Sequence, residues 1–364
     1  MLREQVRDEE EYEELRPEMS RRRKIVVVGL GVFIVFALFA GLVSFWAYRQ
    51  LFPSSPPGDE IVLDIPTGSS TSAIADLLEK KNVIRSAFLF KLYVRVKNAG
   101  PFLAGTYRFP TNDSASDVVR RLRAGPLPPP TRRFTVTPGL NLRQIPAQIT
   151  TAIPTFSVEK INAALTAGQV RSQFQPADKP IEGFLVPDTY EIGEGADETV
   201  AVQAMVSQFD KVAIELGLPD APALVGYSPY EVLTVASLVE EEAKVDADRA
   251  KIAQVIYNRL RQGMPLGVDA TSCYLHEERP CVLRQSDLER DDPYNTRINV
   301  GLPPTPISSV SRAALEAALH PDTGNEIYYV LDPNLPAGQH FFTASASEFE
   351  AAKARCRAAG LGCG

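Results

Sequence analysis

Three consecutive glutamates, Glu240, Glu241 and Glu242, stand near the end of a strongly predicted helix. The sequence SPYE at 228–231 predicts the helix start, because serine caps the backbone, proline suits the first helical position and glutamate can return a hydrogen bond to the cap. Apolar residues recur at helical spacing through EVLTVASLVEEEAKV. Carboxyls held on such a helix can transfer protons when they are partly withdrawn from water.

Helical geometry separates the three carboxyls. At about 100° per residue, Glu241 points almost directly away from the apolar face, so we expect it to be solvated. Glu242 falls beside Val239 at one edge of that face, and Glu240 falls near Ala236 at the other edge. Lost hydration raises the pKa of an edge carboxyl, as a general acid requires near neutral pH. Geometry leaves Glu240 and Glu242 as equal candidates, and a solvated charged face without function is the alternative.

Further polar residues follow in segments that are expected to lie near this helix. A second predicted helix covers 250–262, and turn-rich sequences at 293–296 and 301–304 suit a groove lined by loops. For each polar residue in these segments, a structural role in a turn or cap is the alternative. The residues singled out here are Asn258, Asp269, Thr271, Tyr294 and Asn295.

The four cysteines form two pairs that are close in sequence, Cys273 with Cys281 and Cys356 with Cys363. In an oxidising compartment each pair can close a small disulfide loop, and buried free thiols are the alternative. A zinc site at Cys273, His276 and Cys281 has irregular spacing and no evident fourth ligand. The chain has only three histidines, which argues against histidine-rich metal chemistry, and we expect no metal site. We also expect no cofactor.

An uncharged apolar segment at 25–48 is long enough to cross a membrane as a helix. A cleaved signal peptide is the alternative, but the segment is too long and a 24-residue head precedes it. Four basic residues stand at 21–24, and Arg49 alone follows closely, so the N-terminus is expected in the cytoplasm. This orientation predicts a cytoplasmic tail at 1–24, a single span, and everything from the linker at 49–60 onward outside the cytoplasm.

Proline-rich stretches divide the remaining chain. GPLPPP at 125–130 predicts a boundary between a small α+β domain at 61–133 and a larger mixed α+β domain at 134–350, before a tail at 351–364. The sequence of the small domain predicts, in order, a strand, two helices, a second strand and a third helix. Candidate N-caps of its helices are Ser69, Ser70, Thr71, Ser86, Asp113, Ser114 and Ser116. The net charge of −7 excludes an overall basic field for nucleic acid.

Several motifs, taken in order, resemble those of the endolytic murein transglycosylases, the YceG-like family. The strongest are ASLVEEE at 236–242, VIYNRL at 255–260 and GMPL at 263–266, followed by Asp269. Supporting pieces are AGTY at 104–107, EGFLVPDTY at 182–190, YNT at 294–296, GLPP at 301–304 and His340. The resemblance covers nearly the whole chain after the apolar segment. One departure is LGVDAT at 266–271, where the family usually has leucine, glutamine, any residue, aspartate, proline and threonine.

The resemblance implies a LysM-like module at 61–133 and a YceG-like catalytic domain at 134–350. It also implies that Glu242, the last glutamate of its motif, is catalytic, which decides between Glu240 and Glu242. Residues then expected to bind substrate are Glu240, Asn258, Asp269, Thr271, Tyr294 and Asn295. The implied partners are peptidoglycan glycan strands and, in the same membrane, glycan-polymerising enzymes.

The implied reaction cuts the β-1,4 bond between MurNAc and GlcNAc inside nascent strands and leaves a 1,6-anhydroMurNAc end. Glu242 would protonate the leaving oxygen and then accept the proton of the MurNAc C6 hydroxyl, so a second carboxyl is not required. One alternative is a muramidase that uses water, with Asp269 as the partner carboxyl. Another is a non-catalytic cell-wall-binding protein or division scaffold.

Overall fold

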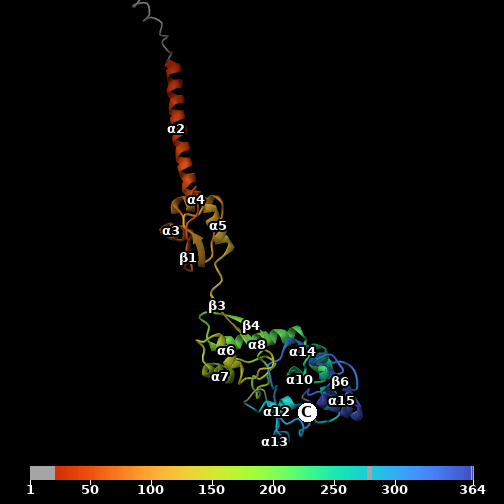
Figure 1. The fold of residues 1–364 in the computed structure, drawn as a ribbon. Helices are drawn as coiled ribbons and strands as arrows, with labels where there is room; N and C mark the ends of the chain where they lie inside the picture. Colours follow the sequence, from red (N-terminus) through yellow and green to blue (C-terminus); the bar gives the residue numbers. More distant parts are fainter. Residues whose placement is uncertain (1–20, 277–280, 362, 364) are drawn as a thin grey trace, which may run out of the picture. The chain divides into compact units, whose positions relative to one another are not determined.

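The computed structural model describes residues 21–276, 281–361 and 363 (Figure 1). It divides the chain into two compact units, with the division between Pro129 and Pro130. The mixed α+β class is confirmed, as is one apolar helix near the N-terminus. The predicted domain limits and the LysM-like nature of the small unit stay predictions, and most of the expected cytoplasmic tail lies outside the described residues.

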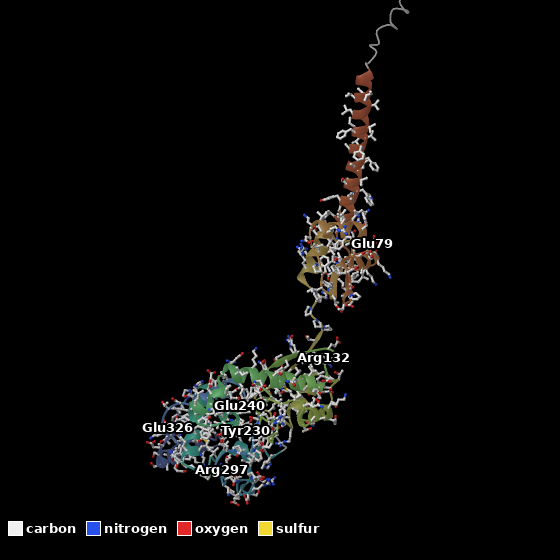
Figure 2. All side chains as sticks on the ribbon, turned by 180° about the vertical axis from the view of Figure 1, so that it is seen from behind. Glu79, Arg132, Tyr230, Glu240, Arg297 and Glu326 are labelled. Carbon is white, nitrogen blue, oxygen red and sulfur yellow. A yellow bond between two sulfur atoms is a disulfide. The ribbon has the colours of Figure 1, made fainter. Side chains whose placement is uncertain are left out.

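The N-terminal helix α2 covers Arg21–Leu51. Its part Ile25–Leu51 has 27 residues and a mean hydropathy of 2.9, and its apolar side chains project into the surroundings on all sides (Figure 2). At about 1.5 Å per residue, this part is long enough to cross the hydrocarbon core of a bilayer. By length and composition α2 is a candidate membrane span.

The small unit follows the predicted order of elements. These are β1 (Glu60–Ile65), α3 (Thr71–Lys80), α4 (Ala87–Val96), β2 (Gly105–Pro110) and α5 (Ala115–Ala124). Strands β1 and β2 pair antiparallel, with Glu60 opposite Pro110. Among the candidate caps, the hydroxyls of Ser70, Ser86 and Ser114 accept the first-turn backbone N–H of α3, α4 and α5. The helices cover the hairpin and enclose one apolar core.

The large unit is mainly helical, with short antiparallel strand pairs. Its elements are β3 (Thr131–Thr135), α6 (Ile145–Ala152), α7 (Val158–Thr166), β4 (Thr189–Gly193), α8 (Glu198–Glu215), η1 (Leu218–Asp220), α9 (Ala221–Leu224), α10 (Pro229–Glu242), η2 (Asp246–Asp248), α11 (Arg249–Arg261), α12 (Asp269–Cys273), α13 (Gln285–Leu288), α14 (Arg312–Leu319), β5 (Tyr328–Leu331), β6 (His340–Thr343) and α15 (Ala346–Ala358). Strand β3 pairs with β4, and β5 pairs with β6.

The expected C-terminal tail at 351–364 is largely helical instead. Residues 351–358 belong to α15, whose Ala352 and Cys356 are fully buried against β5. The alternation of alanine with charged residues gave α15 little apolar signal, and small residues can nevertheless pack closely in a core.

Helix α10 lies at the centre of the large unit. The capping box predicted at Ser228 and Glu231 is present, and every residue from Val232 to Val239 is buried. Loops cover the side that we expected to face solvent: the Ser237 hydroxyl accepts a hydrogen bond from the backbone N–H of Ile307. The helix is therefore enclosed all round, and its C-terminal end carries the three glutamates.

Candidate active site

Glu242 is the last residue of α10 and lines a cavity of about 380 Å³. The cavity lies where the end of α10 meets the hairpin β5–β6 and α15. Its walls carry charges of both signs as well as apolar surface. The lining residues are Glu241, Glu242, Lys244, Arg259, Leu266, Gly267, Asp269, Arg297, Tyr329, Val330, Leu331, His340, Phe349, Lys353 and Cys363.

Tyr329 on β5 holds the Glu242 carboxyl in place. Its hydroxyl donates a hydrogen bond to Glu242 Oε2 at 3.0 Å. The ring of His340 meets the Tyr329 ring edge-on, with centroids 5.5 Å apart. Asp248 fixes that histidine, since its Oδ2 lies 2.8 Å from the ring Nδ1 and accepts the backbone N–H at 2.7 Å. A chain of contacts that starts at the buried Asp248 and His340 thus supports Tyr329 and, through it, Glu242.

Burial raises the pKa of Glu242 above its ordinary range. The hydrogen bond from Tyr329 acts in the opposite direction, and the negative charge of Asp269 adds to the rise. Burial also lowers the pKa of His340, against the opposing effect of Asp248, so this imidazole is neutral near pH 7. Glu242 therefore has the property expected of a general acid, a carboxyl that keeps its proton more readily than usual.

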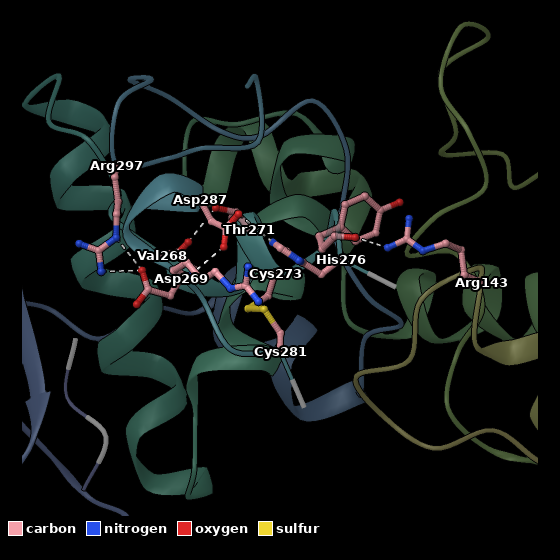
Figure 3. The surroundings of a disulfide bond; sticks show 11 residues. Arg143, Val268, Asp269, Thr271, Cys273, His276, Cys281, Asp287 and Arg297 are labelled. Carbon is pink, nitrogen blue, oxygen red and sulfur yellow. Dashed lines mark hydrogen bonds and ion pairs between the residues drawn. A yellow bond between two sulfur atoms is a disulfide. The ribbon is translucent and has the colours of Figure 1, made fainter. Parts of the chain in front are cut away.

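Arg259 and Arg297 bring fixed positive charge to the same cavity. Arg259 on α11 donates to the carbonyl oxygens of Ile327 at 2.6 Å and Leu266 at 2.5 Å. Burial lowers the pKa of Arg259, while the charge of Glu242 acts against that fall. Arg297 Nε donates to Asp269 Oδ1 at 2.6 Å (Figure 3). Asp269 is thereby held in the cavity as one member of an ion pair.

The model of the YceG-like family matches residues 63–355, which is most of the chain and includes α10 and every cavity-lining residue except Cys363.

The chain belongs to the YceG-like family.

Two similar curated proteins carry the name endolytic murein transglycosylase. That of Bacillus subtilis is 35% identical over 307 residues, covering 80% of this chain and 83% of the relative. That of Streptococcus pneumoniae D39 is 27% identical over 346 residues, and the match spans 60% of that protein. The crystal structure of a YceG-like protein from Listeria monocytogenes is 29% identical, with a TM-score of 0.54 over 81% of this chain and 99% of that one.

Two of the residues predicted for the site line the cavity of this YceG-like chain, namely Glu242 and Asp269. Glu241 lines it too, and the expectation that Glu241 is solvated was wrong, since it is half-buried. The cause is Gly139, whose φ of +78° lets the chain turn tightly against α10. A Cβ at Gly139 would stand 3.2 Å from Glu241 Oε1.

Glu240 supports the framework of the large unit. Its Oε2 accepts the backbone N–H of Ser311 at 2.9 Å, at the start of α14. Its Oε1 lies 3.4 Å from Arg249 Nη1, in a pair shielded from solvent. Glu240 is not among the cavity-lining residues, so its place favours a structural role over substrate binding.

Asn258 and Thr271 also bond to the framework. The Asn258 amide donates to the carbonyl oxygens of Gly324 at 3.2 Å and Glu326 at 2.8 Å, which holds the segment before β5. The buried Thr271 hydroxyl donates to the Val268 carbonyl oxygen at 2.7 Å and does not line the cavity. Both residues position walls of the site.

Tyr294 and Asn295 stabilise the loop after α13. The Tyr294 hydroxyl bonds that of Thr305 at 2.8 Å, and the Asn295 amide donates to the carbonyl oxygens of Leu288 and Arg290. Neither residue lines the cavity. Both residues hold the loop that leads to Arg297, and their predicted contact with substrate stays a prediction.

Glu182 forms a second buried carboxyl group. Its Oε2 accepts a hydrogen bond from the Tyr274 hydroxyl at 2.8 Å and from the backbone N–H of Leu142 at 3.2 Å. Burial raises the pKa of Glu182 to about 7, and these hydrogen bonds oppose the rise. Glu182 therefore ties the turn before α6 to the end of α12.

Both cysteine pairs are joined, Cys273 to Cys281 and Cys356 to Cys363. In the view of Figure 3, Asp269 and Arg297 lie on one side of the first disulfide, and Arg143 and His276 lie on the other. The described residues include no cluster of histidine, cysteine and acidic side chains fit to hold a metal ion.

Proposed function

We propose that this protein is an endolytic peptidoglycan lytic transglycosylase, with Glu242 as its acid and base. It cuts the β-1,4 bond between MurNAc and GlcNAc of nascent strands and so ends their elongation. One observation at Glu242 carries this proposal. The half-buried Glu242 carboxyl lines the wall of a cavity, is held by Tyr329, and has a raised pKa.

The first half of the reaction is a proton transfer from Glu242 to the glycosidic oxygen. Tyr329 occupies Oε2, so Oε1 carries the transferred proton. The bond between C1 of MurNAc and that oxygen breaks, and positive charge develops at C1 and the ring oxygen. Glu241 lines the same cavity, and its carboxylate stabilises that positive charge.

The second half uses the sugar as its own nucleophile. The Glu242 carboxylate accepts the proton of the MurNAc C6 hydroxyl, and the C6 oxygen attacks C1 to close a 1,6-anhydro ring. Because nucleophile and target belong to one sugar, little entropy is lost on bringing them together. Glu242 ends protonated, ready for the next strand.

A muramidase is the second candidate, because Asp269 also lines the cavity. Hydrolases that use water place two carboxyls beside the scissile bond. The ion pair of Asp269 with Arg297 keeps this carboxylate engaged, which favours the first candidate. The chemical nature of the product ends distinguishes the two.

We propose the membrane arrangement on separate grounds. Helix α2 anchors the chain, and the basic residues at 21–24 keep the N-terminus in the cytoplasm. The LysM-like module at 61–133 and the catalytic domain from 134 then act outside, near glycan-polymerising enzymes of the same membrane. Outside the membrane, the catalytic domain can reach the growing glycan strand.

The decisive experiment compares the full-length protein with its Glu242→Gln variant on nascent glycan. Glutamine keeps the shape but cannot give up a proton, so cleavage should fall by about 10²–10⁴-fold. Glu159→Gln, an exposed position on α7, is the matched control and should cleave at the normal rate. Mass spectrometry should find 1,6-anhydro ends. Undiminished cleavage by Glu242→Gln would falsify the assignment, and reducing ends would favour the muramidase.

A further inference from the structure

Helix α4 of the small unit presents three large apolar side chains to its surroundings. Phe88, Leu92 and Val96 are 73%, 48% and 74% exposed. They are spaced four residues apart, so at about 100° per residue they form one stripe along the helix. An exposed helix face normally carries polar residues, and a continuous apolar stripe marks a surface that another apolar phase covers.

The stripe lies opposite the face by which α4 packs. Ala87, Phe90 and Val94 are buried in the core of the small unit. Their directions around the helix average about half a turn from those of the three exposed residues. The core therefore lies on one side of α4, and the apolar stripe faces directly away from it.

Aromatic contacts hold α4 at the end of α2. The ring of Tyr93 on α4 meets that of Phe52, with centroids 5.9 Å apart, and Phe52 in turn contacts Tyr48 of α2. Leu51, the last residue of α2, packs against the core of the small unit. Figure 1 shows α4 beside this end of α2, with β1 farther away. A membrane crossed by α2 therefore ends close to α4.

The charges on α4 suit lipid headgroups. Its sequence AFLFKLYVRV contains basic residues and no acid. Arg95 lies next to Val96 beside the stripe, Lys97 follows the helix, and both are exposed. Basic side chains around an apolar helix face are the pattern of helices that lie in the interface of anionic membranes.

We propose that α4 lies in the outer surface of the membrane, with Phe88, Leu92 and Val96 inserted among the lipids at the headgroup boundary. The proposal rests on α2 being a membrane span, as proposed above, and it does not depend on the reaction. The small unit is then held flat on the bilayer by α2 and α4 together.

Lipid quenching of tryptophan fluorescence tests this proposal, because Trp46 is the only tryptophan in the chain. The full-length protein is placed in vesicles of phosphatidylcholine and phosphatidylglycerol, with or without brominated acyl chains. In the wild type, Trp46 reports the span. In a Trp46→Phe background, Leu92→Trp reports the stripe, and Val62→Trp is the matched control, since Val62 is a 63% exposed residue on β1.

Brominated lipid should quench the tryptophan at 92 several-fold more strongly than the one at 62. Phe88→Trp, which keeps an aromatic side chain, should behave as Leu92→Trp does. If Trp46 is quenched and the tryptophans at 88 and 92 respond as weakly as that at 62, the docking of α4 is wrong and the span stands. If Trp46 itself is not quenched, the span is wrong and the docking with it.

Discussion

The hydrogen bond between Tyr329 and Glu242 makes the two carboxyl oxygens inequivalent, because only Oε2 accepts the tyrosine hydroxyl. Oε2 accepts the phenol hydrogen bond at 3.0 Å, and under the proposed function Oε1 exchanges a proton with the sugar. The bond also tempers the effect of burial, because it stabilises the carboxylate and lowers a pKa that burial raises. Tyr329 thus acts through Glu242, as a positioning residue.

Removing the phenol hydroxyl should change both rate and pH dependence. In Tyr329→Phe the carboxylate loses a stabilising donor, so the pKa of Glu242 rises further. Under the proposed function the reaction needs Glu242 protonated, so the alkaline limb of the pH–rate profile should move to higher pH. The loss of orientation should lower kcat by about tenfold to a hundredfold. Initial rates on glycan between pH 4 and pH 9 measure both effects.

Tyr328→Phe is the matched control, because Tyr328 is the neighbouring residue on β5 and its ring stacks on Phe349. Its profile should match that of the wild type. A Tyr329→Phe profile that superimposes on the wild-type one would show that the phenol does not set the pKa of Glu242.

Local sequence could narrow the candidate carboxyls to Glu240 and Glu242, but it could not identify the tyrosine that contacts Glu242. The repeat of 3.6 residues per turn gives the direction of each side chain around a single helix, and it places Glu242 at the edge of the apolar face. Tyr329 lies 87 residues later in a short strand, and nothing local connects the two. For the same reason, local sequence could not show that Asn258, Tyr294 and Asn295 do not line the cavity. Their side chains hold the loops around it.

At the scale of elements, Glu182 joins two segments that are distant in sequence. It binds the backbone before α6 and the Tyr274 hydroxyl after α12. The next residue, Gly183, has a φ of +86°, and a Cβ there would stand 2.6 Å from the Cβ of Pro306. The Glu-Gly pair therefore combines a buried acid with a close approach that only glycine permits.

This buried acid should make stability depend on pH. The folded chain keeps a proton on Glu182 up to about pH 7, whereas the unfolded chain releases it near the ordinary value of 4.5. Between these values the folded state binds more protons, so stability falls as pH rises and levels off above about 7. The loss is of order 3 kcal/mol, since each pKa unit is worth about 1.4 kcal/mol.

Glu182→Gln removes this titration and keeps a side chain that can accept both hydrogen bonds. Urea unfolding at pH 5 and pH 8 should show a smaller fall in stability for the variant than for the wild type. All other titrating groups are shared and cancel in that comparison. An equal fall in both proteins would mean that Glu182 is already ionised in the fold at pH 5.

Helix starts were predictable because their causes are local. Ser70, Ser86, Ser114 and Ser228 each cap the helix that the sequence indicated. The surroundings of α10 were not predictable in this way. Its covering loops come from residues on both sides in sequence, for example Gly139 and Ser309, joined by a backbone hydrogen bond of 3.2 Å.

At the scale of the whole molecule, the disulfides bear on which side of the membrane the large unit lies. All four cysteines are paired within it. Disulfides persist outside the cytoplasm and are reduced inside it. They agree with the orientation that the basic residues before α2 indicate, and each observation is independent of the other.

Thiol labelling in cells tests this orientation. Cells that express the full-length protein are quenched with acid, and denatured protein is treated with a polyethylene glycol maleimide. We expect no shift in gel mobility before reduction and, after reduction, a shift for each of Cys273, Cys281, Cys356 and Cys363. Full labelling without reductant would place the large unit in the cytoplasm and contradict the proposed arrangement.

Part of the cavity wall is built from the last segments of the chain, since Tyr329, His340, Phe349 and Lys353 all follow Glu242 by many residues. A polypeptide anchored by α2 emerges from the export channel with its C-terminal end last. Under the proposed function, a partly exported or truncated chain carries its acid without the phenol that orients it. Peptidoglycan cleavage then begins only after β5 and β6 have crossed the membrane and folded against α10, so the exported part of the chain stays inactive until that point.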